Sequence, residues 1–231
     1  MNQSAKTVTI PATGERFDLG RPGAIAAWNR SLNRHYGMEN LRAHPSRLVR
    51  RIEARRRARI DTLVGRRPFQ RAVDLGAEDG SLSAQWSRHG RVVFLVDVDL
   101  SRLASSNRRA VGADASRLPL QSGACDLVVM SAILEHVPDP HATVAEAARV
   151  AGPGGRIVLY VPWDGAVVRA KRWARRFGFR LGKLHAELAP GHLHCFDRAA
   201  LRALLAPVSR RFEIRLDPWS FGWYAEAEIG A

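Results

Sequence analysis

The sequence predicts an α/β protein whose main sheet is doubly wound, mostly parallel and covered by helices on both faces. From residue 71 onward, short apolar runs alternate with stretches of helical period. Runs such as VVFLV and LVVM are continuously apolar, which is typical of parallel strands buried on both faces. At residues 71–80, an apolar strand ends in an acid and a glycine turn follows, RAVDLGAEDG. A strand, tight turn and helix start in this order indicate a site for an anionic or nucleotide-like ligand.

The remaining elements follow in chain order. We expect strands at residues 72–75, 92–97, 126–130 and 156–161, with a further short strand before Asp114. We expect helices at residues 81–88, 102–109 and 142–150. A helix at residues 198–205 then precedes strands at residues 212–216 and 223–227, which are close enough in sequence to form a hairpin or an antiparallel pair.

Residues 1–20 are polar and predict a loose arm or a short strand. Residues 46–64 predict a helix with one broad apolar face, formed by Leu48, Val49, Ile52, Ile60, Leu63 and Val64. Its arginines form either a solvated face or a phosphate-contacting surface. Residues 165–183 predict a second basic amphipathic helix, which packs on the domain, covers a substrate as a lid or contacts a membrane surface.

The bulk composition is that of an ordinary globular protein with an unusual charge. A length of 231 residues fits one domain with a sizeable core. The net charge of +14 suggests RNA or an anionic membrane as a partner, but only three of the 36 basic residues are lysines, and this skew also fits a compositional bias. No apolar run approaches the roughly 18 residues of a membrane span. The first residues lack a leader pattern and two cysteines predict no disulfide framework, so we expect a cytoplasmic protein.

Two acids stand at the end of the strand expected at residues 92–97, and the sequence suggests a different role for each. Asp97 ends the strand and lies 21 residues after Gly76, at the distance where a nucleotide-binding fold holds a ribose diol. A carboxylate matches a vicinal diol because it accepts two charge-assisted hydrogen bonds. Asp99 stands just ahead of the next helix and suits a helix N-cap better. We therefore expect Asp97 to be the ribose ligand.

Three further segments narrow the class of protein. They are GADASRLPL at residues 112–120, CDLVVMSAILEHVPDP at residues 125–140 and RVAGPGGRIVLYVP at residues 149–162. In this order and spacing, they resemble class I S-adenosylmethionine-dependent methyltransferases, and the type 11 branch most closely. The resemblance covers about residues 70–162 and continues through GHLHCFDRAALRALL at residues 191–205. It implies a seven-stranded Rossmann-like methyltransferase sheet with an antiparallel last strand, formed by residues 67–231. Residues 163–195 would be a helical insertion or lid, and residues 1–66 an N-terminal arm with a basic helical extension.

The resemblance also implies S-adenosyl-L-methionine as the cofactor and a role for each matching residue. Asp74 and the turn from Gly76 to Gly80 would face its methionine end, Ser131 would line the same pocket, and Asp114 with the Ala115 N–H would bind the adenine edge. The implied cofactor-binding positions are Asp74, Gly76, Ala77, Gly80, Asp97, Val98, Asp114, Ala115 and Ser131. The family has glycine where this chain has Glu78, whose side chain would crowd the cofactor, turn outward or pair with its ammonium group.

Histidines and tryptophans supply the remaining expected site residues. His136 follows the fourth strand. It is either a general base or a histidine that supports the site without touching the substrate, or packs in the core. Residues 163–195 begin at the carboxyl edge of the sheet, so Trp163, Trp173, His192 and His194 are expected on the acceptor side. His192, His194 and Cys195 lack further ligands at the usual metal spacing, and the sequence predicts no metal centre.

The predicted function is methyl transfer to an oxygen, nitrogen or carbon atom of a small-molecule or lipid-like acceptor. Two alternatives stay open at this point. One is an RNA-directed methyltransferase that uses the arginine-rich helices, and the other is a non-catalytic cofactor-binding or scaffold relative, for which Glu78 is the motivating residue. An anionic membrane surface is a further expected contact of the same helices.

Overall fold

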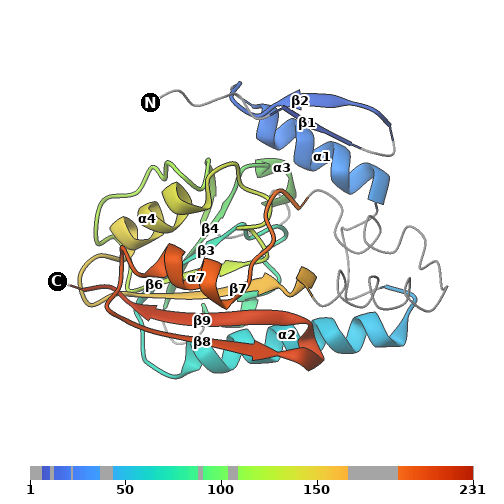
Figure 1. The fold of residues 1–231 in the computed structure, drawn as a ribbon. Coiled ribbons are helices and arrows are strands. Elements are labelled where there is room, and N and C mark those ends of the chain that lie inside the picture. The colour runs from blue at the N-terminus through green and yellow to red at the C-terminus, as the bar shows by residue number, and fades with distance from the viewer. Residues whose placement is uncertain are drawn as a thin grey trace.

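The structure is a computed structural model that describes residues 7–10, 13–21, 23–36, 44–87, 91–103, 109–165 and 192–230. Within these residues, seven strands form one sheet in the order β5-β4-β3-β6-β7-β9-β8 (Figure 1). Its strands are β3 (Arg71–Leu75), β4 (Val92–Asp97), β5 (Arg109–Gly112), β6 (Leu127–Ser131), β7 (Arg156–Pro162), β8 (Arg211–Asp217) and β9 (Gly222–Glu228).

The predicted mixed sheet is confirmed. Strand β3 lies between β4 and β6, and β5 and β7 continue the parallel part on either side. Strand β9 pairs antiparallel with β8, as the short spacing predicted, and antiparallel with β7, as the family resemblance implied. Since the central strands are parallel, the turns that follow β3, β4 and β6 meet at one edge of the sheet, where such folds bind ligands.

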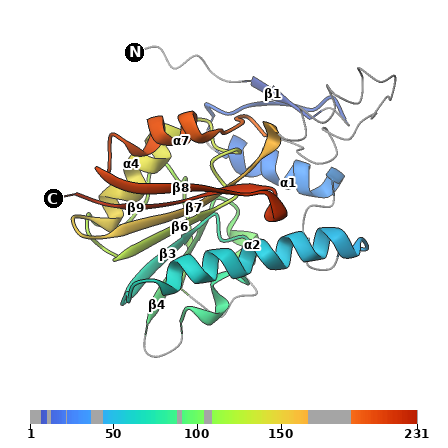
Figure 2. The same ribbon diagram turned by 60° about the horizontal axis from the view of Figure 1, so that its bottom comes forward.

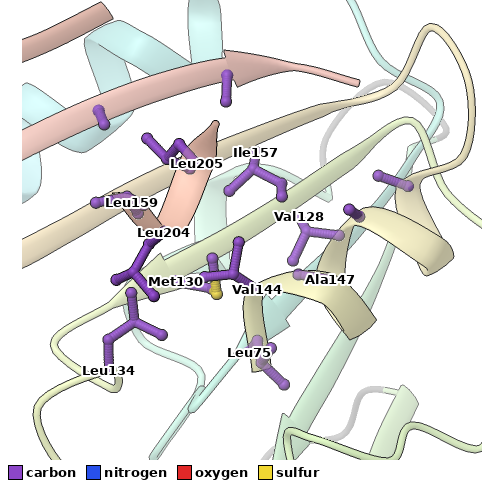
Figure 3. Packing of buried hydrophobic residues seen from close by; sticks show 14 of the residues in the cluster. Leu75, Val128, Met130, Leu134, Val144, Ala147, Ile157, Leu159, Leu204 and Leu205 are labelled. Carbon is purple, nitrogen blue, oxygen red and sulfur yellow. The ribbon is translucent and has the colours of Figure 1, made fainter. Parts of the chain in front are cut away.

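Helices cover both faces of the sheet (Figure 2). Helices α4 (Pro140–Ala151) and α7 (Arg198–Leu205) lie on one face, and α2 (Arg47–Gly65) lies on the other. Strand β6 shows why both faces are apolar, because Val128 and Met130 pack toward α4 and α7, while Leu127 and Val129 pack toward α2. Figure 3 shows the first of these two cores, in which Leu204 and Leu205 of α7 meet the sheet beside Val144 and Ala147 of α4.

Local sequence explains where these helices begin and end. Asp139 caps α4 by accepting from the Ala142 N–H at 3.0 Å, and Pro140 stands at its first turn. Gly152, with φ +65°, ends the same helix. Asp197 caps α7 in the same way, accepting from the Ala200 N–H at 2.8 Å. Helix and strand starts in this part of the chain agree with the sequence to within about two residues.

An N-terminal layer precedes the sheet and contains a helix that the sequence analysis did not predict. Strands β1 (Thr7–Thr9) and β2 (Arg16–Asp18) form an antiparallel hairpin, followed by α1 (Ala24–Tyr36). Figure 1 shows this layer at the top of the view. It has a small core of its own, made of Ile10, Leu19, Trp28 and Leu32, against which Leu193 packs.

Several expected elements differ in the structure. The helix expected at residues 81–88 is only the 3₁₀ turn η2 (Ser83–Gln85). Asp79 accepts from the Ser81 N–H at 2.9 Å, which favours a turn there, and the buried Trp86 is tied to Asp61 at 2.8 Å.

The helix expected at residues 102–109 starts earlier, as α3 (Leu100–Leu103), and Arg109 instead begins β5 because it pairs with Phe94. Leu48, expected on the apolar face of α2, is 65% exposed, because the described core contacts of this helix lie in its later turns. The helix expected at residues 165–183 lies almost wholly outside the described residues. In the part of the chain that the structure describes, no helix has the length and apolar character needed to cross a membrane.

We predict that Gly222→Ala destabilises the sheet. A 3₁₀ turn, η3 (Pro218–Ser220), joins β8 to β9, and Gly222 starts β9 directly beneath the ring of Tyr160. An added Cβ would lie 1.9 Å from Tyr160 Cε2, so the ring must move. Overpacking of this kind costs about 1–3 kcal/mol. Denaturant unfolding measures the loss.

Gly65→Ala is the matched control for this substitution. An added Cβ at Gly65 meets nothing within 4 Å, and the residue ends α2. Alanine there should leave stability unchanged or raise it by up to about 1 kcal/mol. Equal stability of the two variants would contradict the close packing of Tyr160 against β9.

Candidate functional site

A cavity of about 220 Å³ lies at the carboxyl edge of β3, β4 and β6. The turn after β3 forms one wall, and the residues after β4, β5 and β6 form others. Helices α1 and α2 contribute side chains as well, from Ile25, Asn29 and Leu32 and from Arg56 and Arg57. The cavity therefore stands where the sequence analysis placed a nucleotide-like ligand.

The glycine turn after β3 is hydrogen-bonded to the neighbouring strand β4. The Gly76 and Ala77 N–H groups both donate to the Val96 carbonyl, at 2.8 and 3.0 Å. Gly76 has φ +76°, and an added Cβ would lie 2.9 Å from Ile133 Cδ1. Only glycine fits here without strain, and its backbone then borders the cavity directly. Gly80 also has a positive φ, but it packs under Leu95 and is absent from the cavity lining within the described residues.

Asp97 and Asp99 take the two different positions that the sequence suggested. Asp97 borders the cavity, and its two carboxylate oxygens accept from the Glu78 and Asp99 N–H groups, each at 2.9 Å. These bonds fix the carboxylate and leave each oxygen with a free lone pair. Asp99 is buried and caps the start of α3, accepting from the Ser101 N–H at 3.3 Å and its hydroxyl at 2.7 Å. The ligand role of Asp97 stays a prediction that this geometry supports.

Asp74 is a buried acid with an unused oxygen. Its side chain is almost fully buried at the end of β3 and borders the cavity, and its Oδ2 atom has no hydrogen-bond partner in the described structure. Burial raises the pKa of this carboxyl to about 6, although Ser83 and Arg57 act in the opposite direction. An unsatisfied buried acceptor is costly, so this position suits a ligand that brings a hydrogen-bond donor.

The other predicted cofactor positions also border the cavity. Asp114 is exposed, and one of its oxygens accepts from the Ser116 N–H and hydroxyl, both at 2.8 Å. Val98, Ala115 and Ser131 border the same space. The structure thus brings together residues that follow four different strands, as the sequence analysis expected.

Glu78 adopts the backbone conformation of the glycine that the family has at this position. Its φ is +56°, in the left-handed region that favours glycine. Its N–H is the donor to Asp97, and its side chain pairs with the guanidinium of Arg102. The carboxylate is 45% exposed, so it turns toward the rim of the cavity and toward Arg102.

The sequence analysis missed Arg56 and Arg57, which reach the site from α2. Arg56 donates two hydrogen bonds to the buried Glu53, at 2.7 and 2.6 Å, and a third to Ser131 Oγ at 2.9 Å. Burial acts to lower the pKa of Arg56, but Glu53 outweighs it and the pKa is raised. Arg57 donates to the Ser81 carbonyl. These arginines belong neither to a solvated face nor to a phosphate-contacting surface, because protein groups already hold them.

His136 also borders the cavity. It borders the space beside Val137 and Pro138, and its ring meets the indole of Trp28 edge-on, with centroids 6.3 Å apart. Trp28 belongs to α1, so the N-terminal layer packs over this part of the site. The spacing of Ile25, Trp28 and Leu32 at positions i, i+3 and i+7 was the signal that could have revealed this helix.

The other residues expected on the acceptor side do not line the cavity in the part of the chain that the structure describes. His192 donates to or accepts from Asp164 at 2.9 Å through Nδ1, and its ring lies 4.9 Å from that of His136. His194 contacts the Val137 carbonyl through Nε2 at 3.0 Å. Trp163 follows β7 and its backbone N–H donates to Phe221, while Trp173 lies outside the described residues. Of these expected residues, only His136 borders the cavity among those that the structure describes.

Glu135 was not singled out from the sequence, although it precedes His136. Its side chain is almost fully buried, and neither carboxylate oxygen has a hydrogen-bond partner in the described structure. Burial raises the pKa of this carboxyl to about 7, and the nearby His192 acts in the opposite direction. Burial also acts to lower the pKa of His192, but Asp164 and Glu135 outweigh it and the pKa is raised.

Comparison with known proteins agrees with the fold and the site. The family model described as "Methyltransferase domain", type 11, matches residues 73–159. A demethylmenaquinone methyltransferase from Beutenbergia cavernae is 38% identical over 109 residues, which cover 45% of each chain. The chain thus spans about half the length of the curated relatives it matches.

Solved structures extend the likeness over most of the chain. A SAM-dependent methyltransferase from Thermotoga maritima superposes with a TM-score of 0.63 at 14% identity, covering 88% of this chain and 98% of that one. A magnesium protoporphyrin IX methyltransferase from Synechocystis, with bound SAH, gives a TM-score of 0.58 at 18% identity, covering 92% and 98%.

The fold is Rossmann-like and matches that of solved class I methyltransferase structures. Residues 73–159 match the type 11 methyltransferase domain, and the matching stretch is similar to S-adenosylmethionine-dependent methyltransferases. The cofactor of the class is S-adenosylmethionine. The residues present fit this cofactor. The buried Asp74 Oδ2 atom has no hydrogen-bond donor, and two backbone N–H groups fix the Asp97 carboxylate in an orientation in which it can still accept from hydroxyl groups.

We predict that Glu78→Gly changes affinity for S-adenosylhomocysteine by less than about tenfold, or about 1.4 kcal/mol. The reason is that the backbone N–H, which supports Asp97, survives the substitution, while the side chain turns to Arg102. Calorimetric titration of the full chain measures this affinity.

Glu78→Ala is the matched control, because it also removes the carboxylate but keeps a Cβ at φ +56°. It should be less stable than Glu78→Gly by about 1 kcal/mol. A wild-type chain that does not bind, together with a glycine variant that does, would mark the natural protein as a degenerate relative.

Proposed function

We propose that this protein transfers a methyl group from S-adenosylmethionine to a small-molecule or lipid-like acceptor. The observation that carries the proposal is the convergence of Asp74, Asp97 and Asp114 on one cavity that His136 also borders. Bound there, S-adenosylmethionine supplies an electrophilic methyl group on a sulfonium centre.

Each acid has a chemical partner in this ligand. The fixed Asp97 carboxylate would accept from both ribose hydroxyls, and the unpartnered Asp74 Oδ2 would accept from the ammonium group. Asp114 would accept from the adenine amino group, with the Ala115 N–H beside it. Arg56, which the buried Glu53 holds, would keep Ser131 in place along the same cavity.

The acceptor would enter at the His136 end. Ile25, Leu32 and Ile133 give apolar surface around the cavity, and His136 adds an aromatic ring. This mixture suits an apolar or aromatic acceptor. Several curated relatives are demethylmenaquinone methyltransferases, which supports an acceptor of quinone-like, membrane-soluble chemistry.

The chain's own contribution would be alignment and exclusion of water. Little covalent chemistry is needed from the protein, because holding the acceptor atom in line with the methyl group removes much of the entropic barrier. Helix α1 would help exclude water, since Trp28 packs over His136. A base is required only for an acceptor that loses a proton before attack.

A direct test combines binding and turnover. The full chain is titrated with S-adenosylmethionine and S-adenosylhomocysteine, and then incubated with labelled cofactor and quinol, phenol, amine or RNA acceptors. Transfer to a small apolar acceptor is the expected result. Transfer to RNA alone, with steeply salt-dependent binding, would replace this proposal by the RNA-directed one. Failure to bind either cofactor form would favour a scaffold role.

We predict that Asp97→Ala weakens S-adenosylhomocysteine binding by about 1.5–3 kcal/mol, because it removes charged hydrogen bonds from a partly buried site. Asp99→Ala is the comparison, since that acid caps α3 and lies off the cavity. It should cost stability more than affinity. Unchanged binding in the first variant and lost binding in the second would show that the ribose acid is Asp99.

We also predict a pH dependence of cofactor binding that comes from Asp74. Its pKa is raised to about 6, so the carboxyl is protonated at pH 5, and an ammonium group binds the ionised form. Affinity for S-adenosylhomocysteine should therefore fall about tenfold between pH 8 and pH 5.

Asp74→Asn should bind more weakly at pH 8 and lose most of this pH dependence, while folding of both proteins is followed by circular dichroism. A wild-type affinity that stays level across the range would contradict a role for the Asp74 carboxylate.

A further inference from the structure

Beside the cofactor cavity, the buried Glu135 and the half-buried His136 and His192 form a group of ligand-type side chains. Glu135 and His136 follow β6, and His192 comes from a segment 56 residues further along the chain. One ligand-type atom from each lies within 4.8 Å of the others. We propose that Glu135, His136 and His192 bind a divalent transition-metal ion, for which Zn²⁺ is the first probe.

The donor set decides the class of ion. Two imidazoles and one carboxylate are a recurrent ligand set for Zn²⁺ and for other first-row transition metals, whereas Mg²⁺ and Ca²⁺ prefer oxygen ligands. A Zn²⁺ ion about 2.0–2.2 Å from each ligand needs donor atoms a little over 3 Å apart. Side-chain shifts of about 1 Å would bring these three groups to that spacing.

The second observation is the state of Glu135. A carboxylate that is almost fully buried, with neither oxygen hydrogen-bonded in the described structure, is a costly feature. A cation between it and the two imidazoles would neutralise the carboxylate and coordinate one of its oxygens. A bound cation would therefore explain why an acid is buried here without hydrogen bonds, which the packing of the protein alone does not explain.

The third observation is the support around His192. Asp164, itself buried at the end of β7, contacts His192 Nδ1 at 2.9 Å. This leaves Nε2 as the atom available to an ion, and a carboxylate on the far nitrogen is the usual support of a metal-bound histidine. The Leu193 N–H donates to the Glu135 carbonyl at 2.7 Å, so the backbone also ties the two ligand segments together.

Three protein ligands would leave a coordination position for water or a substrate oxygen. Since His136 also borders the cavity, that position would lie near its acceptor end. An ion there would favour an acceptor with a hydroxyl or enol oxygen, because coordination lowers the pKa of a bound oxygen acid. This acceptor role rests on the proposed function, but binding of the metal does not.

Metal binding is tested on the full chain after treatment with a chelator. Titration with Zn²⁺ should show one tight site per chain and a raised melting temperature. Co²⁺ should give visible bands of a low-coordinate site without the near-ultraviolet absorption of a thiolate ligand, which separates this site from the exposed Cys195. A wild-type chain that binds neither ion would overturn the proposal.

Variants assign the site. Glu135→Gln keeps the size of the side chain and should abolish tight binding, and Asp164→Asn should weaken it by about 10–100-fold. His141→Ala is the control, because this exposed histidine lies on α4 and outside the group. Unchanged Zn²⁺ affinity in the folded Glu135→Gln protein, or a loss in His141→Ala, would place the metal elsewhere and overturn the proposal.

The outcome is separate from that of the methyltransferase proposal. Cofactor titration without metal measures the Asp97 side of the cavity, and metal titration without cofactor measures the Glu135 group. Tight metal binding in a chain that fails to bind cofactor would support this site and contradict the proposed function. Cofactor binding in a chain that fails to bind metal would support the proposed function and overturn this site.

Discussion

The burial of β3 between β4 and β6 is the constraint on which the rest of the structure depends. Parallel strands buried on both faces must be apolar along their length, so polar side chains gather where the strands end. Asp74, Asp97 and Ser131 are the last residues, or the last but one, of these three strands. The site is therefore a direct result of sheet pairing, and the glycine turn fits because Gly76 and Ala77 bond to the neighbouring strand.

Burying acids at this edge requires compensation, which the arginines of α2 supply. Arg56 neutralises Glu53 and holds Ser131, while Arg57 lies close enough to Asp74 to favour its ionised form. Arg55, in the same helix, pairs with Asp217 at 2.9 Å, and Arg66, just after the helix, pairs with Glu226 at the same distance. Part of the large positive charge is thus structural, and the net charge alone says little about partners.

The region around His136, which we propose as the acceptor side, is built differently from the turns that carry Asp74 and Asp97. It is assembled from segments far apart in the chain, namely α1, the turn after β6, the end of β7 and the residues just before α7. The core of Ile10, Leu19, Trp28 and Leu32 fixes α1 there, and Leu193 extends this core to the histidine segment. Under the proposed function, an N-terminal layer of this kind would shape the acceptor side while the cofactor side stays unchanged.

The sequence by itself determined the sheet, its mostly parallel order, the glycine turn and the acids of the cofactor side. These features are local, since an apolar strand, a turn residue and the acid that follows are neighbours in the chain. Only the tertiary structure decided the rest. It shortened the helix expected at residues 81–88, placed α1 over the cavity, turned Glu78 toward Arg102 and brought His192 to Glu135. Except for the local bond between Asp79 and the Ser81 N–H, those outcomes depend on contacts between residues tens of positions apart, which the spacing of residues along the chain does not reveal.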